Sequence, residues 1–224
     1  MAESGDGRQA RAPRGRRVSN AAFRRGRRAQ RVIRRGLSIA RAADAVGTIE
    51  SGCEIFGLTK GDYSLIDLIE HCLDTTGPAE VVVSTWSAAG ADLEFARGFV
   101  ADGRVRRLRF VVDYTFVERQ PEYVALMRER FGDEAIRLTR NHAKFVVVSN
   151  NEWALCLRSS MNLNENKRME SWELSDDRGM ADYLLGVVES LFASERGAVQ
   201  LAKRAKDHKL AFASWFGDEV RDRD

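Results

Sequence analysis

Residue types suited to chemistry gather around a single His-x-Lys pair and the polar residues that follow it: His142, Lys144, Ser160, Asn162 and Glu170. On a β-strand, residues two positions apart point to the same face, so the imidazole and the ammonium group of the pair are predicted to lie side by side. Lysine and asparagine donors can hold phosphate oxygens, and an imidazole can attack phosphorus. The pattern therefore indicates phosphoryl chemistry that requires neither a metal nor another cofactor.

A predicted β-hairpin positions these residues. The apolar run 145–148 continues the strand that begins at the histidine, and Asn150-Asn151-Glu152 indicates a turn because asparagine tolerates positive φ. Residues 153–157 form the second strand, after which the serine and asparagine follow. The alternative for the His-x-Lys pair alone is a buried strand with a hydrogen-bonded histidine and an extended lysine. The polar residues downstream favour a site.

The pattern resembles the motif of the phospholipase D superfamily, which reads H-x-K-x4-D, then G-S-x-N, then a glutamate. The paired histidine and lysine match, as do Ser160 and Asn162, while Ser159 stands where the motif has glycine. One position departs, because Ser149 takes the place of the motif aspartate. Glu170 is the better match to the trailing acid, since it precedes Asp176-Asp177 by six residues, and Glu173 is the alternative. The resemblance covers roughly residues 52–195.

The resemblance implies a mechanism and a set of roles. His142 of one half of the site would attack phosphorus and form a phosphohistidine, and His142 of the other half would protonate the leaving oxygen. Lys144 and Asn162 would hold the non-bridging oxygens with support from Ser160, and Glu170 would orient an imidazole. Because the chain has only one such motif, the resemblance implies a homodimer with a composite site. Three residues are predicted as buried anchors of its interface: Trp153, Met161 and Trp172.

Other residues follow predicted strands and are candidates for binding substrate: Trp86, Asp113, Arg158 and Ser159. Sites in α/β sheets gather at the carboxyl ends of strands, where Trp86 and Asp113 are expected. We predict that these residues line the substrate groove and that Trp86 stacks on a base. The alternative for Trp86 is a core tryptophan.

The charge of the chain is unevenly distributed. Its formal net charge is +3, but residues 1–36 hold twelve arginines against two acids, which gives +10 and leaves −7 for the remainder. Seven arginines of this arm are predicted to bind nucleic acid, with DNA as the expected polymer: Arg24, Arg25, Arg27, Arg28, Arg31, Arg34 and Arg35. A solubilising tail is the alternative. Membrane binding is not expected, because the apolar face of the arm is thin.

The bulk composition is that of one intracellular globular domain with appendages. The chain has 224 residues, 44% of them hydrophobic, and contains no apolar run long enough to cross a membrane. Arginines near the start are not followed by an apolar core, so no signal peptide is expected. The three cysteines lie in apolar segments without zinc spacing, which favours free thiols in the cytoplasm.

Alternating apolar patterns predict the fold class. Strands are expected at 53–58, 81–86, 108–112, 135–139, 145–148, 153–157 and 169–174, and helices at 64–74, 91–101, 121–131, 180–192 and 199–215. This order predicts an α/β domain with a mixed, mostly parallel sheet and helices on both faces, similar to the phospholipase D fold. The predicted organisation is a basic arm at 1–50, disordered to helical, the domain at 51–196 and a helical extension at 197–224.

Three functions are compatible with the sequence. The first is a metal-independent nuclease of phospholipase D type, similar to small single-motif proteins that occur in phage and prophage. The second is a DNA-binding module that keeps the phosphate pocket but has lost turnover through the Ser149 departure. The third is a phospholipase, which the arginine-rich arm and the absence of a lipid-facing apolar stretch disfavour.

Overall fold

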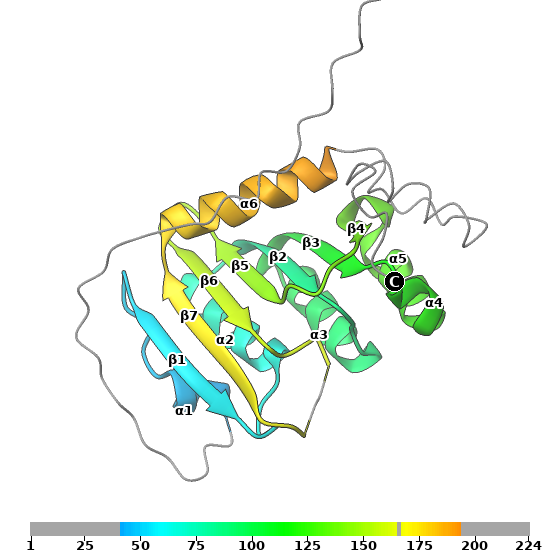
Figure 1. The fold of residues 1–224 in the computed structure, drawn as a ribbon. Coiled ribbons are helices and arrows are strands. Elements are labelled where there is room, and N and C mark those ends of the chain that lie inside the picture. Colours follow the sequence, from blue (N-terminus) through cyan, green and yellow to red (C-terminus); the bar gives the residue numbers. More distant parts are fainter. Residues whose placement is uncertain (1–40, 165–166, 194–224) are drawn as a thin grey trace, which may run out of the picture.

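A single seven-stranded sheet forms the centre of the molecule. The structure, a computed structural model, describes residues 41–164 and 167–193. The strands are β1 (Glu54–Thr59), β2 (Ala79–Thr85), β3 (Val105–Asp113), β4 (Ile136–Thr139), β5 (Phe145–Ser149), β6 (Ala154–Ser159) and β7 (Glu170–Asp176). Their order across the sheet is β1-β7-β6-β5-β2-β3-β4, so β5 returns from the β4 edge to the middle (Figure 1).

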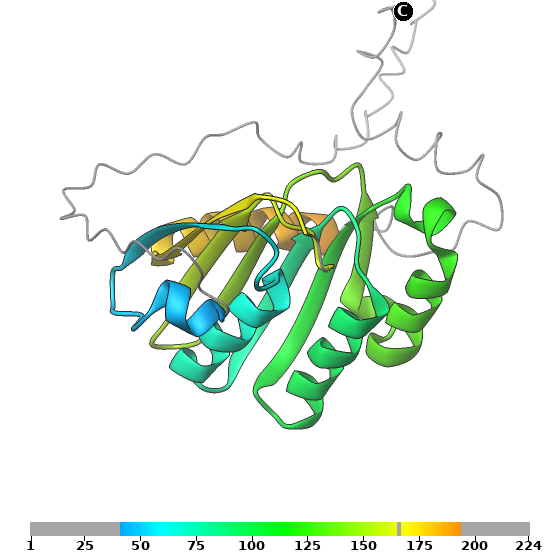
Figure 2. The ribbon, with the colours of Figure 1, turned by 90° about the horizontal axis from the view of Figure 1, so that it is seen from below.

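Helices cover both faces of this sheet, which confirms the predicted mixed α/β class. The helices are α1 (Ala42–Val46), α2 (Leu65–Thr76), α3 (Gly90–Ala101), α4 (Phe116–Arg119), α5 (Pro121–Phe131) and α6 (Arg178–Phe192), with a short 3-10 helix at Asp133–Ala135. Helices α1, α2, α3 and α5 lie on one side of the sheet and α6 on the other (Figure 2). The predicted helix at 199–215 and residues 1–40 of the predicted arm lie outside the described residues.

The sheet contains fewer parallel pairings than the sequence suggested. Within the described chain, β2–β3 and β3–β4 pair in parallel, whereas the other four pairings are antiparallel. A parallel pairing requires a crossover, and helices α3 and α5 supply one for each parallel pair. Strands β5 and β6 are instead joined by a tight turn at Asn150, and β7 returns beside them without a helix.

Side-chain chemistry explains where the helices begin and end. The backbone N–H of Ser64 donates to Asp67 at 2.7 Å, a capping box that begins α2 as the sequence predicts. Gly77 and Gly132 end α2 and α5 with φ of 66° and 80°, a region that glycine enters without strain. The folded body starts before residue 51, because Ala42, Val46 and Ile49 are buried in the main core.

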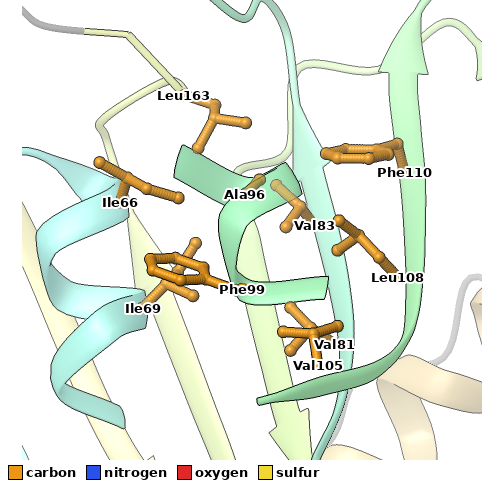
Figure 3. A pocket seen from close by; sticks show the side chains of 10 residues that line it. All are labelled: Ile66, Ile69, Val81, Val83, Ala96, Phe99, Val105, Leu108, Phe110 and Leu163. Carbon is orange, nitrogen blue, oxygen red and sulfur yellow. The ribbon is translucent and has the colours of Figure 1, made fainter. Parts of the chain in front are cut away.

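The main core lies between the sheet and helices α2 and α3. Apolar side chains from these elements surround a void of only about 10 Å³, without a polar atom in its lining (Figure 3). A space this small and apolar is a packing defect and not a ligand site.

Where β1 pairs with β7, the ring of Trp172 packs over Gly57, and a Cβ added to Gly57 would lie 2.2 Å from that ring. The Nε1–H of Trp172 donates to the Tyr63 hydroxyl at 3.0 Å.

The three cysteines are reduced in this fold. Cys72 and Cys156 are buried and Cys53 is partly buried, and none of the three forms a disulfide with another described residue. Burial raises the pKa of the Cys72 and Cys156 thiols to about 12, so both stay protonated and unreactive at neutral pH. No helix among the described residues has the length and apolar character needed to span a membrane.

Candidate active site

One edge of the sheet collects the polar residues that the sequence singled out. Strands β2, β3, β4 and β6 end at this edge, whereas β5 and β7 begin there, because β5 and β7 run antiparallel to their neighbours (Figure 1). The loop at 140–144, the segment after β6 and the start of β7 therefore meet. The helical crossovers leave this edge open, which is the usual place for a site in an α/β sheet.

The segment that carries the His-x-Lys pair is a loop and not the start of a strand. Strand β5 begins at Phe145, so the prediction that the pair lies on one strand is wrong. The reason is a change of direction: the chain leaves β4 at the sheet edge, passes over the ends of β3 and β2, and only then pairs with β2. The two side chains nevertheless lie together.

Asn141 fixes the shape of this loop. Its amide nitrogen donates to Ser84 Oγ at 3.0 Å and to two backbone carbonyls of β2 and β3 at 3.2 and 3.1 Å. Its amide oxygen accepts the Ala143 N–H at 3.0 Å, and its own N–H donates to Asp113 at 2.9 Å. Asn141 is buried, so these bonds form in a setting that excludes water. Sequence reasoning missed this residue, whose only signal is its place directly before the histidine.

Asp113, the last residue of β3, also holds this loop. This carboxylate is buried, and its second oxygen accepts the backbone N–H and the hydroxyl of Thr115. The structure thus places Asp113 at the predicted edge, as a residue that bonds to the protein itself. Its predicted contact with substrate stays a prediction.

His142 and Lys144 form the centre of the candidate site. Lys144 Nζ lies 3.2 Å from Nδ1 and 3.4 Å from Nε2 of the imidazole, and donates to the His142 carbonyl at 3.0 Å. The His142 side chain is exposed, while Lys144 is partly buried. Burial lowers the pKa of Lys144, and the negative charge of Glu170 opposes that shift. The ammonium group is therefore oriented by the loop and lies within the field of the glutamate.

The segment after β6 brings a hydroxyl and a carboxylate to the same edge. The Ser160 hydroxyl donates to Glu170 and accepts the Ser171 N–H at 3.0 Å. The Ser159 hydroxyl donates to the Ser171 carbonyl at 2.9 Å, which joins β6 to the start of β7. Glu173 instead pairs with Arg158 on the face of the sheet that carries α6. The geometry favours Glu170 over Glu173 as the acid beside the lysine.

Trp86 connects Asn162 to the histidine. The Trp86 backbone N–H donates to Asn162 Oδ1 at 3.2 Å, which leaves the amide nitrogen of Asn162 to donate elsewhere. The indole ring lies 5.9 Å from the imidazole, centroid to centroid. On the indole lies the guanidinium of Arg119, with its central carbon 3.7 Å from the ring centroid. Arg119 belongs to α4, a helix that the sequence analysis did not predict.

Ser149, the departure from the resembling motif, lies away from this edge. It is the last residue of β5 and pairs with Glu80 and Ala154, so it lies five residue steps along the chain from Lys144. At strand spacing this corresponds to roughly 17 Å. The side chain that replaces the motif aspartate is therefore not part of the edge where the other candidate residues meet.

Two of the three predicted interface anchors are core residues of the monomer. Met161 and Trp172 are buried, at 3% and 1% exposure, and Trp153 is only partly exposed. The prediction that Met161 and Trp172 anchor a partner is wrong, because their apolar surfaces are already used in the core. Exposed large apolar side chains on β1 and directly before β7 are Phe56, Leu58 and Met169.

No family model and no curated protein matches the sequence. Several solved structures are similar in fold. NucT from Helicobacter pylori shares 12% identity with a TM-score of 0.43, over 61% of this chain and 97% of that chain. Polyphosphate kinase from Porphyromonas gingivalis shares 14% identity with a TM-score of 0.44, over 61% of this chain and 26% of that chain. Phosphatidylserine synthase from Haemophilus influenzae shares 15% identity with a TM-score of 0.43, over 62% and 38%. Likenesses this distant assign neither a family nor a function.

Proposed function

We propose that this protein is a phosphodiesterase of phospholipase D type that hydrolyses nucleic acid through a phosphohistidine, without a metal. The observation that carries the proposal is the contact between Lys144 Nζ and the exposed His142 imidazole at 3.2 Å, on an open sheet edge. A nucleophile beside a fixed cation is the arrangement that phosphoryl transfer requires, since the cation stabilises charge on the non-bridging oxygens.

The reaction would proceed in two displacements. An imidazole nitrogen of His142 forms a bond to phosphorus while the bond to the leaving oxygen breaks, and a second imidazole donates a proton to that oxygen. Water then attacks the phosphohistidine after giving a proton to the second imidazole, which releases the phosphate monoester and restores His142. Lys144 and the amide nitrogen of Asn162 hold the non-bridging oxygens. Glu170, which accepts a hydrogen bond from Ser160, would act on Lys144, because its negative charge opposes the loss of the lysine proton.

A second copy of the chain would supply the second imidazole. Of the other histidines, His71 lies on α2 with its Nε2 2.8 Å from the Gly47 carbonyl, and His208 lies outside the described residues. A two-fold dimer would bring two His142 side chains to one site. Phe56, Leu58 and Met169 are 64%, 57% and 71% exposed on β1 and before β7, and we propose this apolar surface as the interface.

We propose nucleic acid as the substrate because one part of the chain is strongly basic. The arm at residues 1–36 carries +10 by sequence, and such an arm is suited to a polyanion. Deleting residues 1–36 should weaken DNA binding and flatten its salt dependence, by roughly 0.9 in the log–log slope for every phosphate that the arm would neutralise. A slope that stays the same after the deletion would show that the arm does not bind DNA.

The test of the function is hydrolysis of labelled DNA and of phospholipid vesicles, each in excess chelator. We expect DNA cleavage, an acid-labile phosphate on the protein after rapid quenching, and loss of both in His142→Ala. His71→Ala is the matched control, because it removes an imidazole remote from the edge and should retain cleavage. Cleavage of lipid alone would support the phospholipase, and DNA binding without cleavage would support the binding module. Cleavage that stops in chelator would refute the mechanism.

A further inference from the structure

Arg119 is held over the indole ring of Trp86 at the edge of the candidate site. The guanidinium carbon lies 3.7 Å from the ring centroid, close enough for a strong cation–π contact. The Nε–H donates to the Thr115 hydroxyl at 3.2 Å, and one terminal nitrogen donates to the Trp86 carbonyl at 3.3 Å. Three contacts thus fix an exposed side chain that would otherwise be flexible.

This fixed guanidinium keeps donors for a ligand. Two of its nitrogens bond to the protein, and no carboxylate in the described part of the chain pairs with it. Other arginines nearby differ: Arg97 and Arg130 both pair with Glu94. A planar guanidinium without an acidic partner is suited to phosphate, which it binds through two parallel hydrogen bonds.

The place of Arg119 relative to the histidine limits which phosphate it could bind. The Trp86 ring contacts both groups, since its centroid is 5.9 Å from the imidazole centroid and 3.7 Å from the guanidinium carbon. The guanidinium therefore lies within about 10 Å of the imidazole. Charges on one DNA strand follow one another every ~3.4 Å along the helix axis and lie farther apart along the backbone, so a cation within about 10 Å of the nucleophile can reach a neighbouring phosphate.

We infer that Arg119 is a specificity residue that binds a phosphate neighbouring the one attacked by His142, so that the site selects a polyphosphodiester over a substrate with a single phosphodiester. The inference rests on the function proposed above. Trp86 is then the platform for Arg119, with one ring face covered by the guanidinium. A similar pair follows on the same edge, where Arg140 lies over the Tyr114 ring at 5.7 Å, and this continues a basic track toward β4.

The experiment compares an oligonucleotide with bis(p-nitrophenyl) phosphate, which has one phosphodiester, in wild type and in Arg119→Gln. The variant should lose about tenfold more kcat/KM on the oligonucleotide than on the small ester, mainly through KM, since a hydrogen bond to a charged group is removed. Arg106→Gln is the control. It removes an exposed arginine near the start of β3, roughly 23 Å from the site edge, and should keep the wild-type ratio of the two activities.

Binding provides an independent measurement. The log–log salt slope for oligonucleotide binding should fall by about 0.7 for a single strand in Arg119→Gln, and Arg119→Lys should recover most of it because the charge remains. Equal losses on both substrates, or no loss on either, would overturn the inference. If wild type cleaves neither substrate, the proposed hydrolysis is wrong, and the salt slopes still decide whether Arg119 binds a phosphate.

Discussion

Replacing Asn141 by alanine should both destabilise the protein and displace the histidine of the candidate site. The amide makes four hydrogen bonds, to Ser84, to two carbonyls at the ends of β2 and β3, and from Ala143. The substitution removes the donor and the acceptor together and leaves buried groups without partners. The bonds from the Asn141 N–H to Asp113 and from the Ser84 hydroxyl to the Ala143 carbonyl remain, but the loop loses all four bonds of the amide, so the imidazole should lose its fixed position.

The magnitude follows from the number and burial of these bonds. A net hydrogen bond contributes about 0.5–1.5 kcal/mol, and a buried group left without a partner costs more, so Asn141→Ala should lower the free energy of unfolding by roughly 2–4 kcal/mol. With a urea m-value of about 2 kcal/mol per molar, the midpoint should fall by about 1–2 M. A misplacement of the nucleophile by about 1 Å would reduce turnover about a hundredfold.

Asn150 offers a matched control at the opposite end of β5, the strand that follows the Asn141 loop. Its amide also makes four hydrogen bonds, to the carbonyls of Thr76 and Pro78 and from the N–H groups of Glu152 and Trp153. Because the residue is only partly buried, Asn150→Ala should cost about 1–3 kcal/mol of stability. Its turnover per folded molecule should stay at the wild-type level, since the turn is remote from the site.

The assay measures urea unfolding and DNA cleavage on the same preparations, with cleavage expressed per folded molecule. We expect both variants to be less stable and only Asn141→Ala to be slow. Equal turnover in the two variants would refute the reasoning that Asn141 positions the histidine. Wild-type stability in Asn141→Ala would show that water or a loop shift replaces the missing bonds.

Three further outcomes are expected. Burial lowers the pKa of Lys144, so oligonucleotide binding should weaken with rising pH before an ordinary lysine titrates. Because the charge of Glu170 opposes that shift, Glu170→Gln should move this loss of binding to still lower pH. A pH dependence of binding that Glu170→Gln leaves unchanged would show that the carboxylate does not act on Lys144. Gly57→Ala should destabilise the protein by about 1–3 kcal/mol in urea, because its Cβ would overlap the tryptophan ring of β7, whereas Gly98→Ala in α3 meets no atom within 4 Å and should not destabilise. Leu58→Asp should convert the dimer to an inactive monomer in sedimentation, and a wild type that is active as a monomer would contradict the composite site.

The sequence predicted the elements of the fold because each one has a local signal. Strand β2 is built around three consecutive valines, α5 begins with a proline and ends before a glycine, and α2 begins at a capping serine. The order of strands was not predictable in the same way. Strand β5 pairs with β2 and not with β4, its predecessor in the chain, and no residue near Phe145 marks that crossing.

The candidate site likewise combines residues that the sequence marks with residues that only the structure brings to it. Apart from Ser149, the residues that the motif marks lie at one edge because the ends of strands meet there, so spacing along the chain predicted that they would come together, and their roles stay predictions. Asn141 and Arg119 required the structure, since their contacts come from β2, β3 and the segment between β3 and α5. The interface prediction failed for a related reason: a large apolar side chain in a strand has the same pattern whether it faces its own core or a partner. Trp172 faces its own core because Gly57, on the neighbouring strand, has no side chain and leaves room for the ring, and only the pairing of β1 with β7 brings the two residues together.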